Sequence, residues 1–122
     1  MQYVRIYADS EGKSHFDEGE IALSTNNFAP PATPFNVSAP IVADQLVFIA
    51  MPPGWYGEWH PAPRRQYWLQ TSGQIEVEVG DGEIRRFGPA TVVLLEDVTG
   101  KGHVTRVIGD DEVTGAFVQL PR

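Results

Sequence analysis

Two of the three histidines in the chain stand where an imidazole could do chemistry. His60 and His103 each lie beside a glycine-rich turn, and each begins an expected strand. Histidine combines affinity for metal ions with proton exchange near neutral pH. His60 is also a candidate general base if a carboxylate such as Asp97 holds its second ring nitrogen, although it could equally bond only a backbone carbonyl. His15 follows a polar turn, and we expect it at the surface.

Strand alternation predicts which neighbours share a face with these histidines. If the chain is extended from residue 60 onward, Arg64, Gln66 and Trp68 have the parity of His60. The guanidinium of Arg64 would suit a carboxylate ligand. Trp68 is one of three tryptophans between residues 55 and 68, a cluster that fits either an aromatic ligand pocket or a core and dimer interface. We therefore predict that these three residues line a ligand pocket together with the two histidines.

The elements that must position these residues are short strands. Ten prolines and twelve glycines interrupt short apolar runs, and helical periodicity is nearly absent. Apolar and acidic residues alternate through 75–79, and the glycines at 80–82 supply the tight turn of a hairpin. The whole pattern of about eight or nine strands predicts an all-β sandwich or barrel.

Three local expectations follow from hydrophobicity. The apolar run at 45–51 predicts a strand covered on both sides. The proline-rich segment 24–40 predicts a loop along the surface, because Phe28, Phe35 and Val37 favour burial. The residues expected on the inner faces of the barrel are Trp68, Val77, Val79, Val92 and Leu94.

Composition narrows the class of protein. A chain of 122 residues suits one domain. The net charge of −7 makes nucleic acid an improbable partner, because an acidic protein repels phosphate backbones. We expect no membrane association, since no segment is apolar over the length of a membrane span and the N-terminus has no signal-peptide pattern. The lack of cysteine excludes disulfides and thiolate chemistry and fits a cytoplasmic location.

The spacing around His60 resembles the first motif of the cupin superfamily, which contains the RmlC-like jelly rolls. That motif runs from a Gly through a His-x-His pair and a Glu to a second Gly, and Gly54, His60 and Gly73 keep its spacing. Ala62 and Gln66 stand where the motif has its second His and its Glu. His103 matches the His of the second motif, after a longer turn. The chain also resembles a group of small bacterial single-domain cupins without a defined reaction.

The resemblance implies a double-stranded β-helix, the jelly-roll cupin barrel, as a single domain over residues 1–122. Its barrel core would span 41–122. Residues 1–40 would be an N-terminal extension with an edge strand and the proline-rich segment. Because an exposed edge strand is a liability, we expect the extension to pair along a barrel edge, and we predict a homodimer.

The resemblance also frames the function. Metal-binding cupins hold Mn²⁺, Fe²⁺, Ni²⁺ or Zn²⁺ with three His and one Glu, and here the candidate ligands are His60, Gln66 and His103. Glu58, Glu96 or Asp97 would have to complete the set. We therefore predict a metal-free cupin that binds a small molecule in its pocket. The alternatives are a metal-dependent enzyme of dioxygenase or isomerase type that uses His60 and His103, and a purely structural module.

Overall fold

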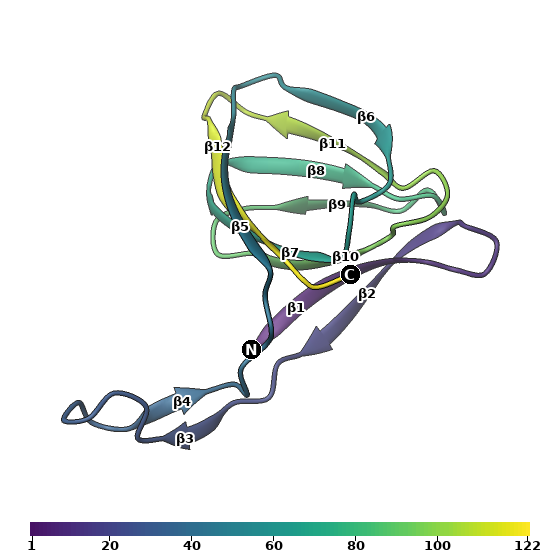
Figure 1. Cartoon of the computed structure of the whole chain (residues 1–122). Helices are drawn as coiled ribbons and strands as arrows, with labels where there is room; N and C mark the ends of the chain where they lie inside the picture. The colour runs from purple at the N-terminus through teal and green to yellow at the C-terminus, as the bar shows by residue number, and fades with distance from the viewer.

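The computed structural model describes residues 1–122 and consists of β-strands joined by turns (Figure 1). None of the chain forms a helix long and apolar enough to cross a membrane. The strands are β1 (Gln2–Ala8), β2 (Ser14–Glu20), β3 (Ser24–Asn26), β4 (Phe35–Val37), β5 (Gln45–Met51), β6 (Tyr56–His60), β7 (Gln66–Ser72), β8 (Gln74–Glu78), β9 (Ile84–Phe87), β10 (Val92–Glu96), β11 (His103–Ile108) and β12 (Val113–Gln119).

Strands β5 to β12 form a jelly roll. One sheet has six strands in the order β2-β1-β10-β7-β12-β5, and the other has four in the order β6-β11-β8-β9. Along the chain, β5, β7, β10 and β12 therefore belong to one sheet, and β6, β8, β9 and β11 belong to the other. This distribution of eight antiparallel strands over two facing sheets is the double-sheet jelly roll found in cupins. The prediction of an all-β jelly-roll barrel is confirmed.

The N-terminal extension enlarges one sheet of the barrel. β1 pairs in parallel with β10, and β2 pairs antiparallel with β1. These two strands cover what would otherwise be an exposed edge of the barrel at β10, as the edge-strand argument predicts. The pairing takes place within one chain.

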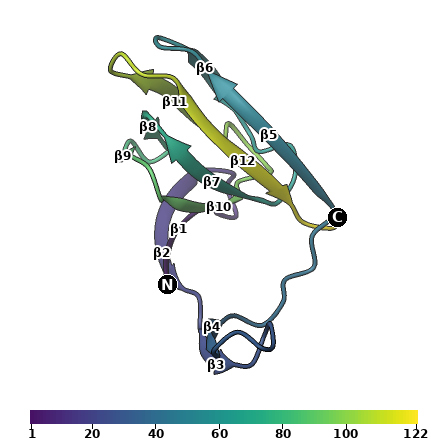
Figure 2. The ribbon, with the colours of Figure 1, turned by 90° about the vertical axis from the view of Figure 1, so that its left-hand side faces the viewer.

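The proline-rich segment does not lie along the surface as predicted. Its strands β3 and β4 form a separate two-stranded hairpin, which projects away from the barrel (Figures 1 and 2). Phe28 and Phe35 keep 66% and 46% of their surface exposed. Their rings meet each other at a centroid distance of 5.9 Å. The prediction was wrong because the two aromatic side chains pack together on the hairpin instead of on the barrel.

A second correction concerns β5, which is covered on one side only. It lies at the edge of the six-stranded sheet and pairs only with β12. Phe48, on its outer side, is 78% exposed. Met51, on its inner side, packs against the core. A continuous apolar run indicates that both sides of a strand favour burial. In the single chain, however, no other element packs on the outer side of β5.

The core between the sheets contains Trp68, Val77 and Val79 as predicted. On β10 the predicted parity is wrong by one residue. Val93 and Leu95 belong to the core, whereas Val92 and Leu94 point to the outer face. Because residues 92–95 are all apolar, hydrophobicity could not show which alternate pair faces inward.

Candidate functional site

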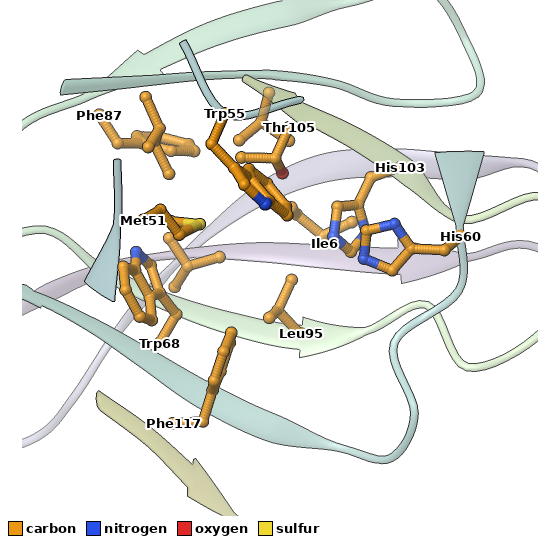
Figure 3. Close-up of a pocket in the computed structure, with 13 residues that line it drawn as sticks. Ile6, Met51, Trp55, His60, Trp68, Phe87, Leu95, His103, Thr105 and Phe117 are labelled. Atoms are coloured by element: carbon orange, nitrogen blue, oxygen red, sulfur yellow. The ribbon is translucent and has the colours of Figure 1, made fainter. Parts of the chain in front are cut away.

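The space between the two sheets holds a small apolar cavity of about 90 Å³ (Figure 3). Most of its lining is hydrophobic, including Ile6, Met51, Trp68, Phe87, Leu95 and Phe117. Its mouth is shared with a second hollow of about 400 Å³, to which Gln66 and Gln119 contribute. The imidazoles of His60 and His103 line both spaces. The arrangement is therefore an apolar chamber whose entrance is polar.

His103 is held from behind by a fully buried carboxylate. Its Nδ1–H donates to Oδ2 of Asp97 at 2.6 Å, and Asp97 has no exposed surface. The backbone of Asp97 is held in turn, because the amide of Ala62 donates to the main-chain carbonyl of Asp97. A carboxylate only accepts hydrogen bonds, so Nδ1 carries a proton, and in the neutral form of the ring Nε2 is an acceptor. The ring of His103 presents this acceptor toward the cavity.

His60 lies beside His103 because β6 and β11 are paired. The two residues are register partners, and their ring centroids are 4.8 Å apart. Gly102 permits this approach, since a Cβ there would collide with the backbone of His60. Nδ1–H of His60 donates to the carbonyl of Glu58 at 2.6 Å. The carbonyl can only accept, so in the neutral form of the His60 ring Nε2 is likewise an acceptor.

Of the two alternatives stated for His60, the structure contains the second. Asp97 holds His103 and not His60, whereas His60 bonds only a backbone carbonyl. The side chain of Glu96 is engaged elsewhere, by Arg5 and Arg65. Glu96 ends β10 and Asp97 follows it outside the strand, so strand alternation could not predict which of these carboxylates meets a histidine.

Gln66 and Trp68 have the predicted parity on β7 and are buried. Gln66 lies at the entrance, where its Oε1 accepts from the side-chain amide of Gln119 at 3.0 Å. Trp68 forms part of the cavity wall, and its indole N–H donates to Gln70 at 3.3 Å. Both residues are therefore near the histidines, with the oxygen of Gln66 and the indole N–H of Trp68 already paired.

Arg64 does not line the cavity. Its guanidinium bonds the side chain of Asp44 at 2.6 Å and the carbonyl of Leu120 at 2.8 Å. The expected alternation fails because residues 61–65 are not part of a strand. The prolines at 61 and 63 interrupt the extended conformation on which the parity argument depended.

The residues at the mouth do not fit the donor set of a cupin metal site. No group of three or more His, Cys, Asp or Glu side chains is close enough to hold an ion. His60 and His103 offer two imidazoles, but the oxygen of Gln66 already accepts from an amide and Asp97 is bound to Nδ1 of His103. A catalytic zinc site takes three protein ligands. Two imidazoles alone fall short of that number.

Sequence reasoning missed several residues of the cavity. Trp55 lines the cavity and is 36% exposed. Met51 and Phe117 form walls, and Thr105 adds a hydroxyl. Thr105 could have been found, because it has the parity of His103 on β11. The remaining tryptophan, Trp59, stacks under the ammonium of Lys101 at 3.9 Å and does not line the cavity.

The third histidine, His15, belongs to a different cluster. Its Nδ1 meets Asp81 at 2.8 Å and its Nε2 meets Asp9 at 2.7 Å. The hydrogen bonds with Asp9 and Asp81 raise the pKa of His15 above its ordinary value. The same contact with His15 is the largest cause that lowers the pKa of Asp9. The three side chains join the β1–β2 turn to the β8–β9 turn.

Comparisons with known proteins add little to the fold assignment that the strand order already supports. No family model and no curated protein matches the sequence. Among solved structures the chain is similar to the cupin domain of Cnp3 from Schizosaccharomyces pombe, with 13% identity and a TM-score of 0.49 over 98% of this chain and 83% of that chain. At this TM-score the likeness carries no argument of its own. The class of the fold, a cupin-type jelly roll, follows from the arrangement of the two sheets.

Proposed function

We propose that this cupin-fold protein binds a small, largely apolar molecule that carries one hydrogen-bond donor, such as a hydroxyl group. The observation that carries the proposal is the oriented His103 at the mouth of an apolar cavity. The apolar part of the ligand would occupy the chamber lined by Trp68 and Phe117. Its donor would meet Nε2 of His103 or of His60.

The preference for a donor follows from the two tautomers. Asp97 and the carbonyl of Glu58 each take the Nδ1 proton of one histidine. In their neutral forms the two rings therefore offer only acceptors to the ligand. An anion would find no donor on either ring and would also approach a protein with a net charge of −7. A hydroxyl compound can donate to these two acceptors, whereas its methyl or carboxylate analogue cannot.

Calorimetric titration with phenol, toluene and benzoate tests this at about pH 8, on the alkaline side of an ordinary imidazole. The three probes share one ring and differ only in the polar group. We expect phenol to bind at least about tenfold more tightly than toluene and benzoate, because an unpaired polar site rejects the analogue that lacks the donor. Equal affinity for phenol and toluene, or stronger binding of benzoate, would contradict the proposal.

The histidines provide a matched pair of variants. His60→Ala removes one acceptor from the mouth, whereas His15→Ala removes an imidazole that has no contact with the cavity. We expect the first variant to weaken phenol binding by about fivefold to tenfold, the usual value of one hydrogen bond. The second should leave binding unchanged. Equal loss in both variants would mean that the effect is not local to the site.

A metal-dependent enzyme remains the second candidate function, because the two imidazoles lie side by side. Elemental analysis of protein purified without a histidine tag, after exposure to Mn²⁺, Fe²⁺, Ni²⁺ and Zn²⁺, distinguishes the two. We expect less than one metal ion per chain, since only two side chains, the imidazoles, are free to act as metal ligands. One ion per chain that is lost in both His60→Ala and His103→Ala would replace the metal-free proposal with this alternative.

A further inference from the structure

The outer side of the six-stranded sheet carries an uncharged apolar surface. We call it the β5–β12–β7 face, and it comprises the outward positions of those three strands. By register, these are three positions on each strand, and none of them is charged. Its main apolar side chains are Leu46, Phe48, Tyr67, Leu69, Ala116 and Val118. An antiparallel sheet whose outer side faces water normally places polar residues there.

The surface is an open, hollowed face and not a scatter of single side chains. A hollow of about 810 Å³ extends over β5, β7 and β12. A second apolar hollow, between the base of the β3–β4 hairpin and the sheet, shares Leu69 and Val118 with it. Leu46 is 57% exposed and Phe48 is 78% exposed. Contiguous exposed apolar surface of this kind marks an interaction site.

The β3–β4 hairpin is the second unpartnered apolar element of the chain. Its legs leave opposite edges of the six-stranded sheet, at β2 and β5, and the hairpin extends beyond the barrel (Figure 2). An isolated two-stranded hairpin is only marginally stable in water. Phe28 and Phe35 are exposed on it. Both the hairpin and the β5–β12–β7 face therefore require a covering surface.

We propose that a second copy of this chain supplies that cover. The two β5–β12–β7 faces pack against each other about a two-fold axis, and each hairpin reaches onto the partner. In a two-fold interface each patch meets its own copy, so charges at the centre would face like charges. The lack of charged residues on this face removes that repulsion for a protein with a net charge of −7. A partner of opposite charge would instead call for acidic or basic groups, and the face has none.

The exposed surface area of the chain agrees with a second copy as the partner. The chain exposes 7222 Å² at a mass of 13.5 kDa. A compact monomer of that mass exposes roughly 6,500 Å², so the excess is roughly 700 Å². A standard interface buries about 800 Å² on each partner. Three strands of seven residues cover a flat area of only about 330 Å², so the hairpin has to contribute the rest.

Size-exclusion chromatography with light scattering, at micromolar protein concentration, tests the proposal on the full chain. We expect a mass twice the 13.5 kDa of one chain. Phe48→Asp places a charge at the proposed interface and should weaken the dimer at least about 100-fold, because like charges then face each other. Leu46→Asp serves as a second variant of the same face. Ile84→Asp, at a 52% exposed apolar residue on the four-stranded sheet, is the matched control and should remain dimeric.

The hairpin has its own variant. Phe28→Ser combined with Phe35→Ser should weaken the dimer about tenfold, since exposed aromatic side chains are strong interface anchors. Fluorescence of the buried Trp68 verifies that each variant is folded. A monomeric wild-type protein would overturn the proposal. So would a dimer that survives both Phe48→Asp and Leu46→Asp, or one that Ile84→Asp disrupts equally.

Discussion

The chain contains two histidine–aspartate clusters that differ in one decisive respect. In the surface cluster both ring nitrogens of His15 are occupied, by Asp81 and Asp9. In the mouth cluster only Nδ1 of His103 is occupied, by Asp97. A histidine with both nitrogens engaged is a structural link, whereas one with a single engaged nitrogen has an acceptor left for a ligand. The number of engaged nitrogens therefore separates a link between turns from a candidate binding group.

The two clusters also differ in solvation. Asp97 is fully buried, and its second oxygen, Oδ1, has no hydrogen-bond partner. Asp9 and Asp81 are partly exposed and can exchange their partner for water. This contrast leads to four predictions.

The largest effect is expected from removing the buried carboxylate. Asp97→Ala leaves His103 buried without its partner and creates a small cavity, so the free energy of unfolding should fall by about 3 kcal/mol. Asp81→Ala should cost much less, because exposed ion pairs contribute little. Urea denaturation of both variants measures the difference. Equal losses in the two variants would abolish the distinction between the clusters.

The second prediction concerns a substitution that keeps the shape of the site but changes which ring nitrogen of His103 carries the proton. In Asp97→Asn the side-chain amide can donate to Nδ1 of His103, which moves the ring proton to Nε2. Phenol should then bind at least about tenfold more weakly, because the wrong tautomer faces the ligand. Acetophenone, which carries a carbonyl acceptor, should gain affinity. Calorimetry with both compounds tests this, and an unchanged preference for phenol would show that the tautomer does not select the ligand.

The third prediction concerns the cavity wall that the mouth cluster has and the surface cluster lacks. A Cβ at Gly57 would collide with the ring of Trp55, which lines the cavity. Gly57→Ala should therefore displace this flexible, half-exposed ring and weaken phenol binding by about threefold to tenfold, since one packed aromatic contact is lost. Stability should change little. The summed emission of the three tryptophans should shift in the variant, and an unshifted spectrum with unchanged affinity would exclude Trp55 from the site.

The smallest effect is the pH dependence of the surface cluster. The pKa of His15 is raised above 6.5, so its contribution is complete below about pH 6.5 and is lost as pH rises through the raised value. The pKa values of Asp9 and Asp81 are lowered below 3.8, so their contribution is complete above about pH 4 and is lost as pH falls through the lowered values. The melting-temperature difference between wild type and His15→Gln should therefore be greatest between these limits. A difference that stays constant from pH 4 to pH 9 would contradict the charged cluster.

Much of the barrel could be predicted from short patterns. The resemblance of the Gly54, His60 and Gly73 spacing to a cupin motif implied the barrel, and the alternation at 75–79 predicted the inner face of β8. Proximity of His60 to His103 followed from their motif positions and is present in the structure. These features are local or depend on a fixed spacing between turns, so one sequence is enough to show them.

The rest depended on what covers each strand. The parity of β10 could not be read from four consecutive apolar residues, and the prolines at 61 and 63 removed Arg64 from its expected face. The sequence predicts burial for the outer side of β5 and for the β3–β4 hairpin, because their residues are apolar, but the single chain leaves them exposed. If the second copy covers them, the sequence indicated burial in the assembly and not in the single chain.

The most direct test of the central claim is a long-range ¹H–¹⁵N spectrum of the imidazoles, recorded with and without phenol. The chain has only three histidines, so each ring can be assigned. We predict that His103 carries its proton on Nδ1, and that phenol shifts the Nε2 resonance of His103 while the resonances of His15 stay in place. A proton on Nε2 of His103 in the free protein, or saturation with phenol that leaves the His103 ring unchanged, would contradict the account.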